Sequence, residues 1–144
     1  MIIQFSVTGT PRPKQSVKKG RNRKTNAVMY YTPAPMKEWQ NAVAWKAKEV
    51  MQGLEPFESR MIVLLDFCLP DNRRKDLDNL SKGCLDGCNK IIWKDDQQII
   101  LLIIAKKIES SDECAEVGVD VYITDAIDTH RITEMLKDVL FKGV

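Results

Sequence analysis

The chain has 144 residues, of which 44% are hydrophobic and 29% are charged, and its formal net charge is +2. This length and composition fit one folded domain, residues 1–144, and exclude a disordered chain. No apolar run reaches membrane-spanning length, and the first residues lack the basic and apolar segments of a secretion signal. We therefore expect a cytoplasmic protein without membrane contact.

The charge is unevenly distributed along the chain. Residues 1–37 contain eight Lys or Arg and no acidic residue, so residues 38–144 carry a net charge of −6. Clustered Lys and Arg displace condensed counterions from phosphates, so the cluster predicts contact with nucleic acid, and a solvated basic loop is the alternative. The clustered cations are Arg12, Lys14, Lys18, Lys19, Arg21, Arg23 and Lys24.

Residues 2–8 are predicted to form a strand, because apolar side chains alternate along them and Gly9 and Pro11 follow. The basic segment, about residues 10–28, is then predicted as a long loop. It ends at the apolar patch 29–31, which we expect to be a second strand.

After Pro33, apolar residues recur at intervals of three and four, which predicts an amphipathic helix that ends near Gly53. Residues 61–69 alternate between two mostly apolar faces, which indicates a central strand of a sheet. Residues 70–72 close this strand. The apolar positions of the helix are Met36, Trp39, Val43, Ala47 and Val50.

A second helix is expected from Leu77, with Asp76 as its N-cap. Gly83 and Gly87 within this helix each lower its stability by up to about 1 kcal/mol relative to Ala. We therefore expect another backbone to approach them closely. The apolar stripe of the helix is Leu77, Leu80, Cys84, Cys88 and Ile91.

The C-terminal third is predicted to contain strands at 97–105 and 117–124 and an extra helix at about 128–142, capped by Asp128 or Thr129. The order of the elements predicts a single α+β domain, with one mixed β-sheet and helices packed on it. The inward residues of the last helix are expected to be Ile132, Met135, Leu136, Val139 and Leu140.

The chain has four cysteines and one histidine, and no CxxC pair occurs. This spacing does not match a zinc site. Cys84 and Cys88 fall in the apolar stripe of the second helix, where a small buried thiol is ordinary. We expect all four cysteines, including Cys68 and Cys114, to be buried thiols.

Two groups of aspartates carry the chemistry. Asp76 and Asp78 follow the basic run 73–75, and Asp95 and Asp96 lie about one helix length downstream. If these carboxylates converge, their mutual repulsion requires a cation, and oxygen-only ligands suit Mg²⁺ or Mn²⁺. Such a site is typical of phosphodiester cleavage. For the downstream pair, a simple turn between helix and strand is the open alternative.

Lys82 lies one helical turn after Asp78, and Asp86 lies one turn further on the same face. The simple interpretation is a surface ion pair that contributes a few tenths of a kcal/mol, roughly. Beside a metal, however, the Lys82 ammonium can hold a non-bridging phosphate oxygen or stabilise charge in the transition state.

These segments also carry a family resemblance. The sequence Pro-Asp-Asn-Arg-Arg-Lys-Asp-Leu-Asp-Asn-Leu-Ser-Lys at 70–82, followed by Trp-Lys-Asp-Asp-Gln-Gln-Ile at 93–99, resembles the RusA family of Holliday junction resolvases. The closest similarity covers residues 69–99. The chain departs from compact family members by continuing into the extra C-terminal helix.

The resemblance implies a Mg²⁺-dependent endonuclease that acts as a homodimer on four-way DNA junctions, with no organic cofactor. It points to Asp76, Asp78 and Asp96 as metal ligands, with Asp95 as a further candidate, and to Lys82 as a catalytic helper. Arg73, Arg74, Lys75 and the basic segment are expected to hold phosphates without reading sequence.

Two other functions compete with this interpretation. Pro70-Asp71 imitates the first element of PD-(D/E)xK nucleases, but the second element, an acidic residue two positions before a Lys, is missing downstream at strand spacing. The non-enzymatic alternative is a DNA-binding accessory protein whose carboxylates are structural.

Overall fold

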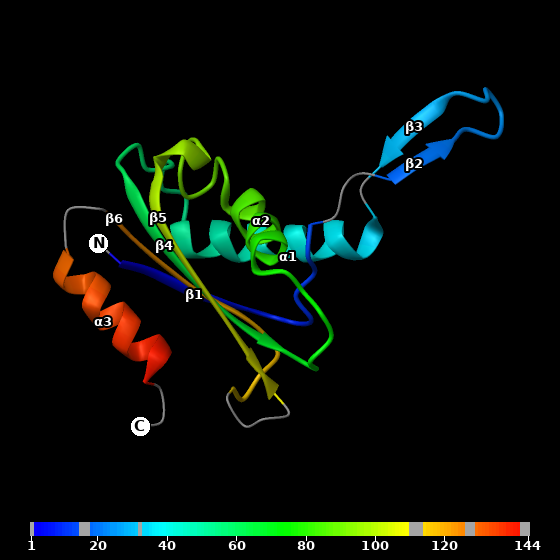
Figure 1. Ribbon diagram of the computed structural model, residues 1–144. Coiled ribbons are helices and arrows are strands. Elements are labelled where there is room, and N and C mark those ends of the chain that lie inside the picture. Colours follow the sequence, from blue (N-terminus) through cyan, green and yellow to red (C-terminus); the bar gives the residue numbers. More distant parts are fainter. Residues whose placement is uncertain (1, 15–17, 32, 110–113, 126–128, 142–144) are drawn as a thin grey trace.

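A computed structural model of the chain describes residues 2–14, 18–31, 33–109, 114–125 and 129–141 (Figure 1). Its elements in chain order are β1 (Ile2–Thr8), β2 (Lys18–Arg21), β3 (Val28–Tyr31), α1 (Ala34–Met51), β4 (Met61–Leu69), α2 (Leu77–Cys88), the 3₁₀ turn η1 (Asp96–Gln98), β5 (Ile99–Ile108), β6 (Gly118–Asp125) and α3 (Thr129–Leu140).

The main sheet has the strand order β1-β6-β4-β5. β4 pairs in parallel with β5 and antiparallel with β6, and β6 pairs antiparallel with β1. Every residue of β4 is buried, because the strand has neighbours on both sides and helices on its faces. The structure confirms the predicted mixed sheet and its central strand.

Helices cover both faces of this sheet (Figure 1). α1 and α2 lie on the face that includes Val63 and Phe67 of β4. α3 lies on the other face, where Met135 and Val139 pack in one cluster with Leu64. The alternation of apolar side chains along β4 therefore builds two cores, one on each side of the sheet. Within the described residues, no helix combines the length and the apolar character that crossing a membrane requires.

The two glycines of α2 lie where other backbone segments pass close to the helix. A Cβ atom on Gly83 would lie 3.3 Å from the carbonyl oxygen of Arg12. A Cβ atom on Gly87 would lie 2.8 Å from Cγ1 of Val43 and 3.0 Å from the carbonyl oxygen of Gln40, both on α1. The close approach that the sequence predicted is confirmed at both positions.

The basic segment differs from the loop predicted at 10–28. It contains strand β2, which pairs with β3 in a separate two-stranded sheet rather than in the main sheet. The turn between them is closed by a hydrogen bond from Asn22 N to the Ala27 oxygen, 2.9 Å, and Asn26 adopts a φ of 57° that Asn tolerates. This hairpin, which we call the basic arm (residues 18–31), extends away from the sheet and its helices (Figure 1).

The C-terminal helix matches its prediction except at its end. Met135 and Val139 are buried as expected, but Leu140 is 60% exposed. A residue one position beyond Val139 is rotated by about 100° around the helix, which turns it out of the stripe that faces the sheet. The helix begins at Thr129. The alternative cap, Asp128, lies outside the described residues.

We predict that Gly87→Ala destabilises the protein by about 1–2 kcal/mol, because overpacking of about 1–3 kcal/mol exceeds the helix-propensity gain of up to about 1 kcal/mol. Chemical denaturation measures the free energy of unfolding. Gly83→Ala is the comparison: its added methyl group would meet one atom closer than 3.4 Å, the carbonyl oxygen of Arg12 at 3.3 Å, so it should destabilise the protein less than Gly87→Ala. Equal stability of Gly87→Ala and wild type would contradict the tight α1–α2 contact.

Candidate active site

Asp76 and Asp78, the α2 pair, lie at the start of α2. Asp76 occupies the predicted N-cap position, but its side chain makes no capping hydrogen bond. Its carboxylate instead lies 3.7 Å from Nε of Arg74 and is 53% exposed. Asp78 is exposed in the first turn. The helix therefore does not use the Asp76 carboxylate for its own capping, which leaves that group available to a ligand.

Lys82 is exposed one turn further along α2 and makes no ion pair with another described residue. Its expected neighbour Asp86 pairs with Lys14 instead. The predicted surface ion pair with Lys82 is therefore not formed through Asp86. The Lys82 ammonium is placed to meet an anion that arrives at the α2 pair.

Asp95 and Asp96 have different local partners. Asp95 caps the 3₁₀ turn: its carboxylate accepts a hydrogen bond from Gln97 N at 2.9 Å, and its own N–H donates to the side chain of Gln98. This is the turn that the sequence left as the alternative. Asp96 accepts a hydrogen bond at 2.6 Å from the ring N–H of Trp93, which is fully buried. Trp93 was not among the predicted site residues, and its only signal was an aromatic residue just before the aspartates.

Within a single subunit, Asp95 and Asp96 do not lie near the α2 pair, contrary to the predicted convergence. Lys106 of β5 donates from Nζ to the carbonyl oxygen of Lys75 at 3.2 Å, so the loop before α2 lies beside the later part of β5. Asp96 precedes Ile99, where β5 begins, and about 23 Å of extended strand separates Ile99 from Lys106. Among the described residues, no group of three or more carboxylate, His or Cys side chains can hold a metal ion.

The segment before the basic arm is fixed on α2. Lys14 N donates to the carbonyl oxygen of Asn79 at 2.9 Å, and Lys75 Nζ donates to the carbonyl oxygen of Pro11 at 3.2 Å. Burial, reinforced by the nearby Arg12 guanidinium, lowers the pKa of Lys75. Lys14 and Lys75 were predicted as phosphate contacts, and the structure gives them internal contacts that hold the segment at 11–14 beside the start of α2.

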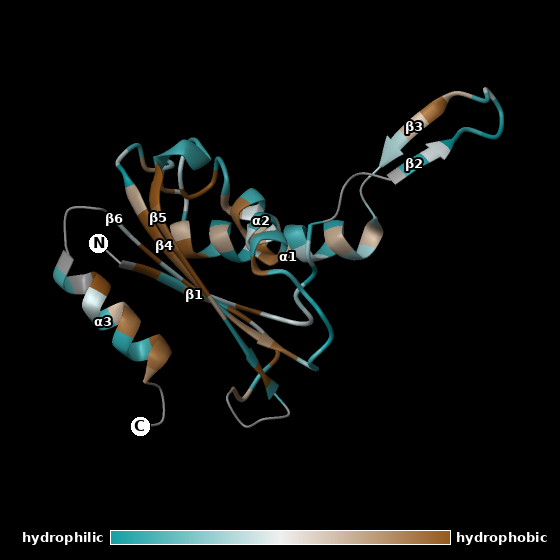
Figure 2. Cartoon of the chain, viewed as in Figure 1, coloured by the Kyte–Doolittle hydropathy of each residue, from teal (hydrophilic) through white to brown (hydrophobic). Residues whose placement is uncertain are grey.

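The other predicted DNA contacts form two exposed groups. Arg12, Arg73 and Arg74 surround the start of α2, and Arg73 also pairs with Asp71 at 3.1 Å. The second group projects from the body on the basic arm (Figure 2). The arm cations with exposed side chains are Lys19, Arg21, Arg23 and Lys24, while the side chain of Lys18 is outside the described part.

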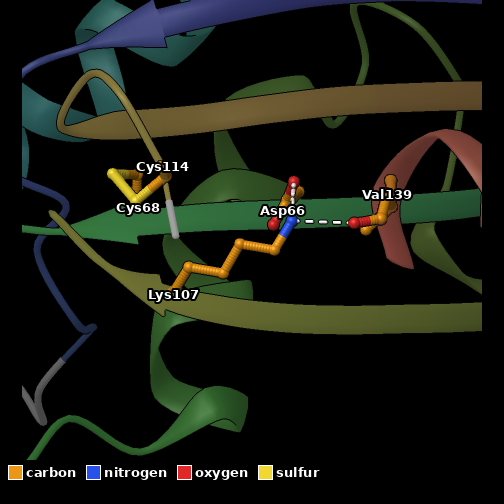
Figure 3. The surroundings of a disulfide bond; sticks show 5 residues. All are labelled: Asp66, Cys68, Lys107, Cys114 and Val139. Carbon is orange, nitrogen blue, oxygen red and sulfur yellow. Dashed lines mark hydrogen bonds and ion pairs between the residues drawn. A yellow bond between two sulfur atoms is a disulfide. The ribbon is translucent and has the colours of Figure 1, made fainter. Parts of the chain in front are cut away.

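The cysteines divide into two kinds. Cys84 and Cys88 are free and buried, as predicted, and burial raises the pKa of Cys84 to about 12 and that of Cys88 well above its usual value. Cys68 and Cys114 form a disulfide, with a Cα–Cα distance of 6.0 Å, so their prediction as thiols is wrong (Figure 3). The pairing depends on the β4–β6 register, which sets Cys68 beside the start of β6. A separation of 46 residues gave no sequence signal.

A cavity of about 540 Å³ lies beside this disulfide, on the α3 face of the sheet. Lys107 of β5 donates to Asp66 of β4 at 3.1 Å and to the carbonyl oxygen of Val139 at 2.8 Å (Figure 3). This buried contact ties α3 to the sheet. The α2 pair does not line the cavity, so the cavity is separate from the candidate site.

The exposed aspartate pair lies at a helix N-terminus among cations, an arrangement that suits a bound phosphate and a divalent cation. The chain belongs to the RusA family, since the family model described as Endodeoxyribonuclease RusA matches residues 5–124. The crossover junction endodeoxyribonuclease RusA of Aquifex aeolicus (strain VF5) is 25% identical over 112 residues, which cover 77% of this chain and 85% of that protein. α3 lies beyond residues 5–124, which the family model matches.

Proposed function

We propose that this protein is an endodeoxyribonuclease that cleaves four-way DNA junctions by paired, symmetric cuts in recombination and repair. The observation that carries the proposal is the exposed α2 pair between two groups of cations. Its family and the name of the relative from Aquifex aeolicus support the same activity. Because the substrate is cellular DNA, we place the protein in the cytoplasm.

We propose Mg²⁺ as the cofactor, with Mn²⁺ able to replace it, held by Asp76 and Asp78. Two exposed carboxylates fit this ion, because Mg²⁺ commonly takes one or two protein carboxylates and completes its shell with water and substrate phosphate. When bound, the ion lowers the pKa of a coordinated water and stabilises charge on the phosphate. The oxygen-only donor set is the structural basis of this assignment.

The protein groups around the α2 pair then have separate tasks. The N–H groups at the start of α2 favour a bound phosphate, and Arg73 and Arg74 hold neighbouring phosphates in register. Lys82 supplies a positive charge to the oxygen that becomes more negative during cleavage. In the alternative function, a DNA-binding module, Asp76 and Asp78 would stabilise the fold and would have no part in cleavage.

A homodimer accounts for the position of Asp96. Two symmetric cuts require two sites related by a two-fold axis. Since Asp96 lies far from the α2 pair of its own chain, we propose that it completes the ligand set of the partner subunit. The short Trp93–Asp96 hydrogen bond would then hold the carboxylate in a fixed orientation at the subunit boundary.

The first test is Asp76→Asn. Asn has the same shape but lacks the charge, so we expect cleavage of a synthetic four-way junction to fall by at least about a hundredfold while DNA affinity holds or rises. Calorimetric titration should show weaker Mg²⁺ binding. Asp138→Asn is the matched control, because it removes an exposed carboxylate charge from α3, on the other face of the sheet, and should cleave normally. Normal cleavage by Asp76→Asn would overturn the site.

The second test mixes subunits. Asp76→Asn and Asp96→Asn homodimers should each be inactive, but a mixed dimer contains one site with both aspartates intact if the sites are shared. A cruciform plasmid should then be nicked but not linearised. Mixing Asp76→Asn with Asp78→Asn is the control and should restore nothing, because both changes affect the same half of each site. An inactive Asp76→Asn with Asp96→Asn mixture would contradict the shared site.

The third test concerns Lys82. Lys82→Ala should lower the cleavage rate by roughly a hundred- to a thousandfold, the usual loss when a transition-state donor is removed. An exposed helical lysine contributes within about 0.5 kcal/mol to stability, so the denaturation midpoint should not change. Lys37→Ala on α1 removes a comparable exposed lysine and should leave the rate unchanged. A wild-type rate for Lys82→Ala would assign Lys82 to the protein surface alone.

A further inference from the structure

The basic arm leaves apolar and aromatic side chains uncovered. All four residues of β3 are exposed, with Tyr30 at 68%, Tyr31 at 47%, and Val28 and Met29 at 45% each. The arm extends away from the body, and β3 includes an apolar stretch within a mostly hydrophilic hairpin (Figures 1 and 2). Contiguous exposed apolar surface on a soluble protein marks a binding surface.

The strand register places these aromatic residues among cations. Lys19 is opposite Tyr30 and Arg21 is opposite Val28, so these four residues share one face of the hairpin. Tyr31 lies on the other face, and its ring lies over Gly20, where a Cβ atom would come within 3.3 Å of Cε1. Each face of the arm therefore presents a tyrosine, and at least one of them places it beside fixed positive charge.

The charge of the arm identifies its partner. No acidic residue occurs in residues 1–37, so every charge on the arm is positive. A second copy of the arm would be repelled, whereas DNA supplies phosphates for the cations and flat bases for the tyrosines. Alternating cations and exposed aromatics are the features of surfaces on which unpaired or unstacked bases stack.

We propose that Tyr30 and Tyr31 stack on bases at the branch point of the junction, while Lys19 and Arg21 hold the adjacent phosphates. Bases inside a linear duplex are already stacked on each other, so a stacking surface gains contacts only where that stacking is interrupted. The arm is then the element that distinguishes branched from linear DNA. This inference rests on the proposed function and assigns its substrate selectivity to named residues.

The test compares Tyr30→Ala and Tyr30→Phe, each in an Asp76→Asn background so that binding is measured without cleavage. We expect Tyr30→Ala to weaken binding to a four-way junction by roughly five- to a hundredfold, the effect of losing one stacked base. Affinity for a linear duplex should not change, and Tyr30→Phe should bind both like the parent. Trp45→Ala is the control, because Trp45 is a 72% exposed aromatic on α1, outside the arm.

Two further measurements separate the tasks of the arm. Lys19→Ala should weaken junction and duplex binding alike and reduce the slope of log affinity against log salt by about one. Fluorescence of 2-aminopurine placed at the branch point should report the stacking directly: binding should change the signal for the parent and for Tyr30→Phe, and not for Tyr30→Ala/Tyr31→Ala.

The outcomes are distinguishable. If the parent binds junction and duplex equally, the proposed function fails. If the parent prefers the junction and Tyr30→Ala/Tyr31→Ala keeps that preference, the proposed function stands and the arm inference is overturned. If the double variant instead sediments as a monomer where the parent is a dimer, the tyrosines belong to a subunit interface and the arm inference is also overturned.

Discussion

The arrangement of the site depends on one backbone crossing. The segment that precedes the basic arm runs across α2 and is held there by the hydrogen bond between Lys14 N and the Asn79 oxygen. Gly83 favours the crossing, because a Cβ atom at this position would lie 3.3 Å from the carbonyl oxygen of Arg12. The crossing brings residues more than sixty positions apart, Pro11 and Lys75, into contact. Without it, the segment at 11–14 would not be held beside the start of α2.

The positive charge of the molecule is concentrated near this crossing. Most cations of the first 37 residues gather at the arm and its base, while the rest of the chain carries a net charge of −6. A polyanion that approaches the molecule is therefore attracted at the arm and the start of α2 and repelled elsewhere. The negative α2 pair lies inside the attractive region, flanked by arginines on one side and by Lys82 on the other. This field favours approach of DNA to the aspartates from one direction.

Sequence patterns predicted the elements of the main fold because each depends on local periodicity. The central strand, the two central helices and strand β6 follow from alternation or from helical spacing. The glycines of α2 predicted a close contact without identifying its partner. The spacing of Asp76, Asp78 and Lys82 likewise placed them correctly at one helix end. These features need few contacts between distant residues.

The features that the sequence did not predict depend on tertiary register. The disulfide requires that β6 pair with β4, which brings Cys114 to Cys68 across 46 residues. The distance between Asp96 and Asp76 requires that β5 run parallel to β4, so that the two ends of the connecting segment lie at opposite ends of the sheet. The β2–β3 pairing was hidden because β2 is short and charged, and strand signals rely on apolar alternation.

The crossing at Lys14 has a geometric consequence for the proposed cleavage. The hydrogen bond from Lys14 N to the Asn79 oxygen joins the segment at 11–14 to α2, so this segment and the proposed ligands Asp76 and Asp78 move as one unit. Under the proposed function, a DNA strand bound along residues 11–14 is therefore cut at a spacing that the dimensions of the protein set, rather than its base sequence.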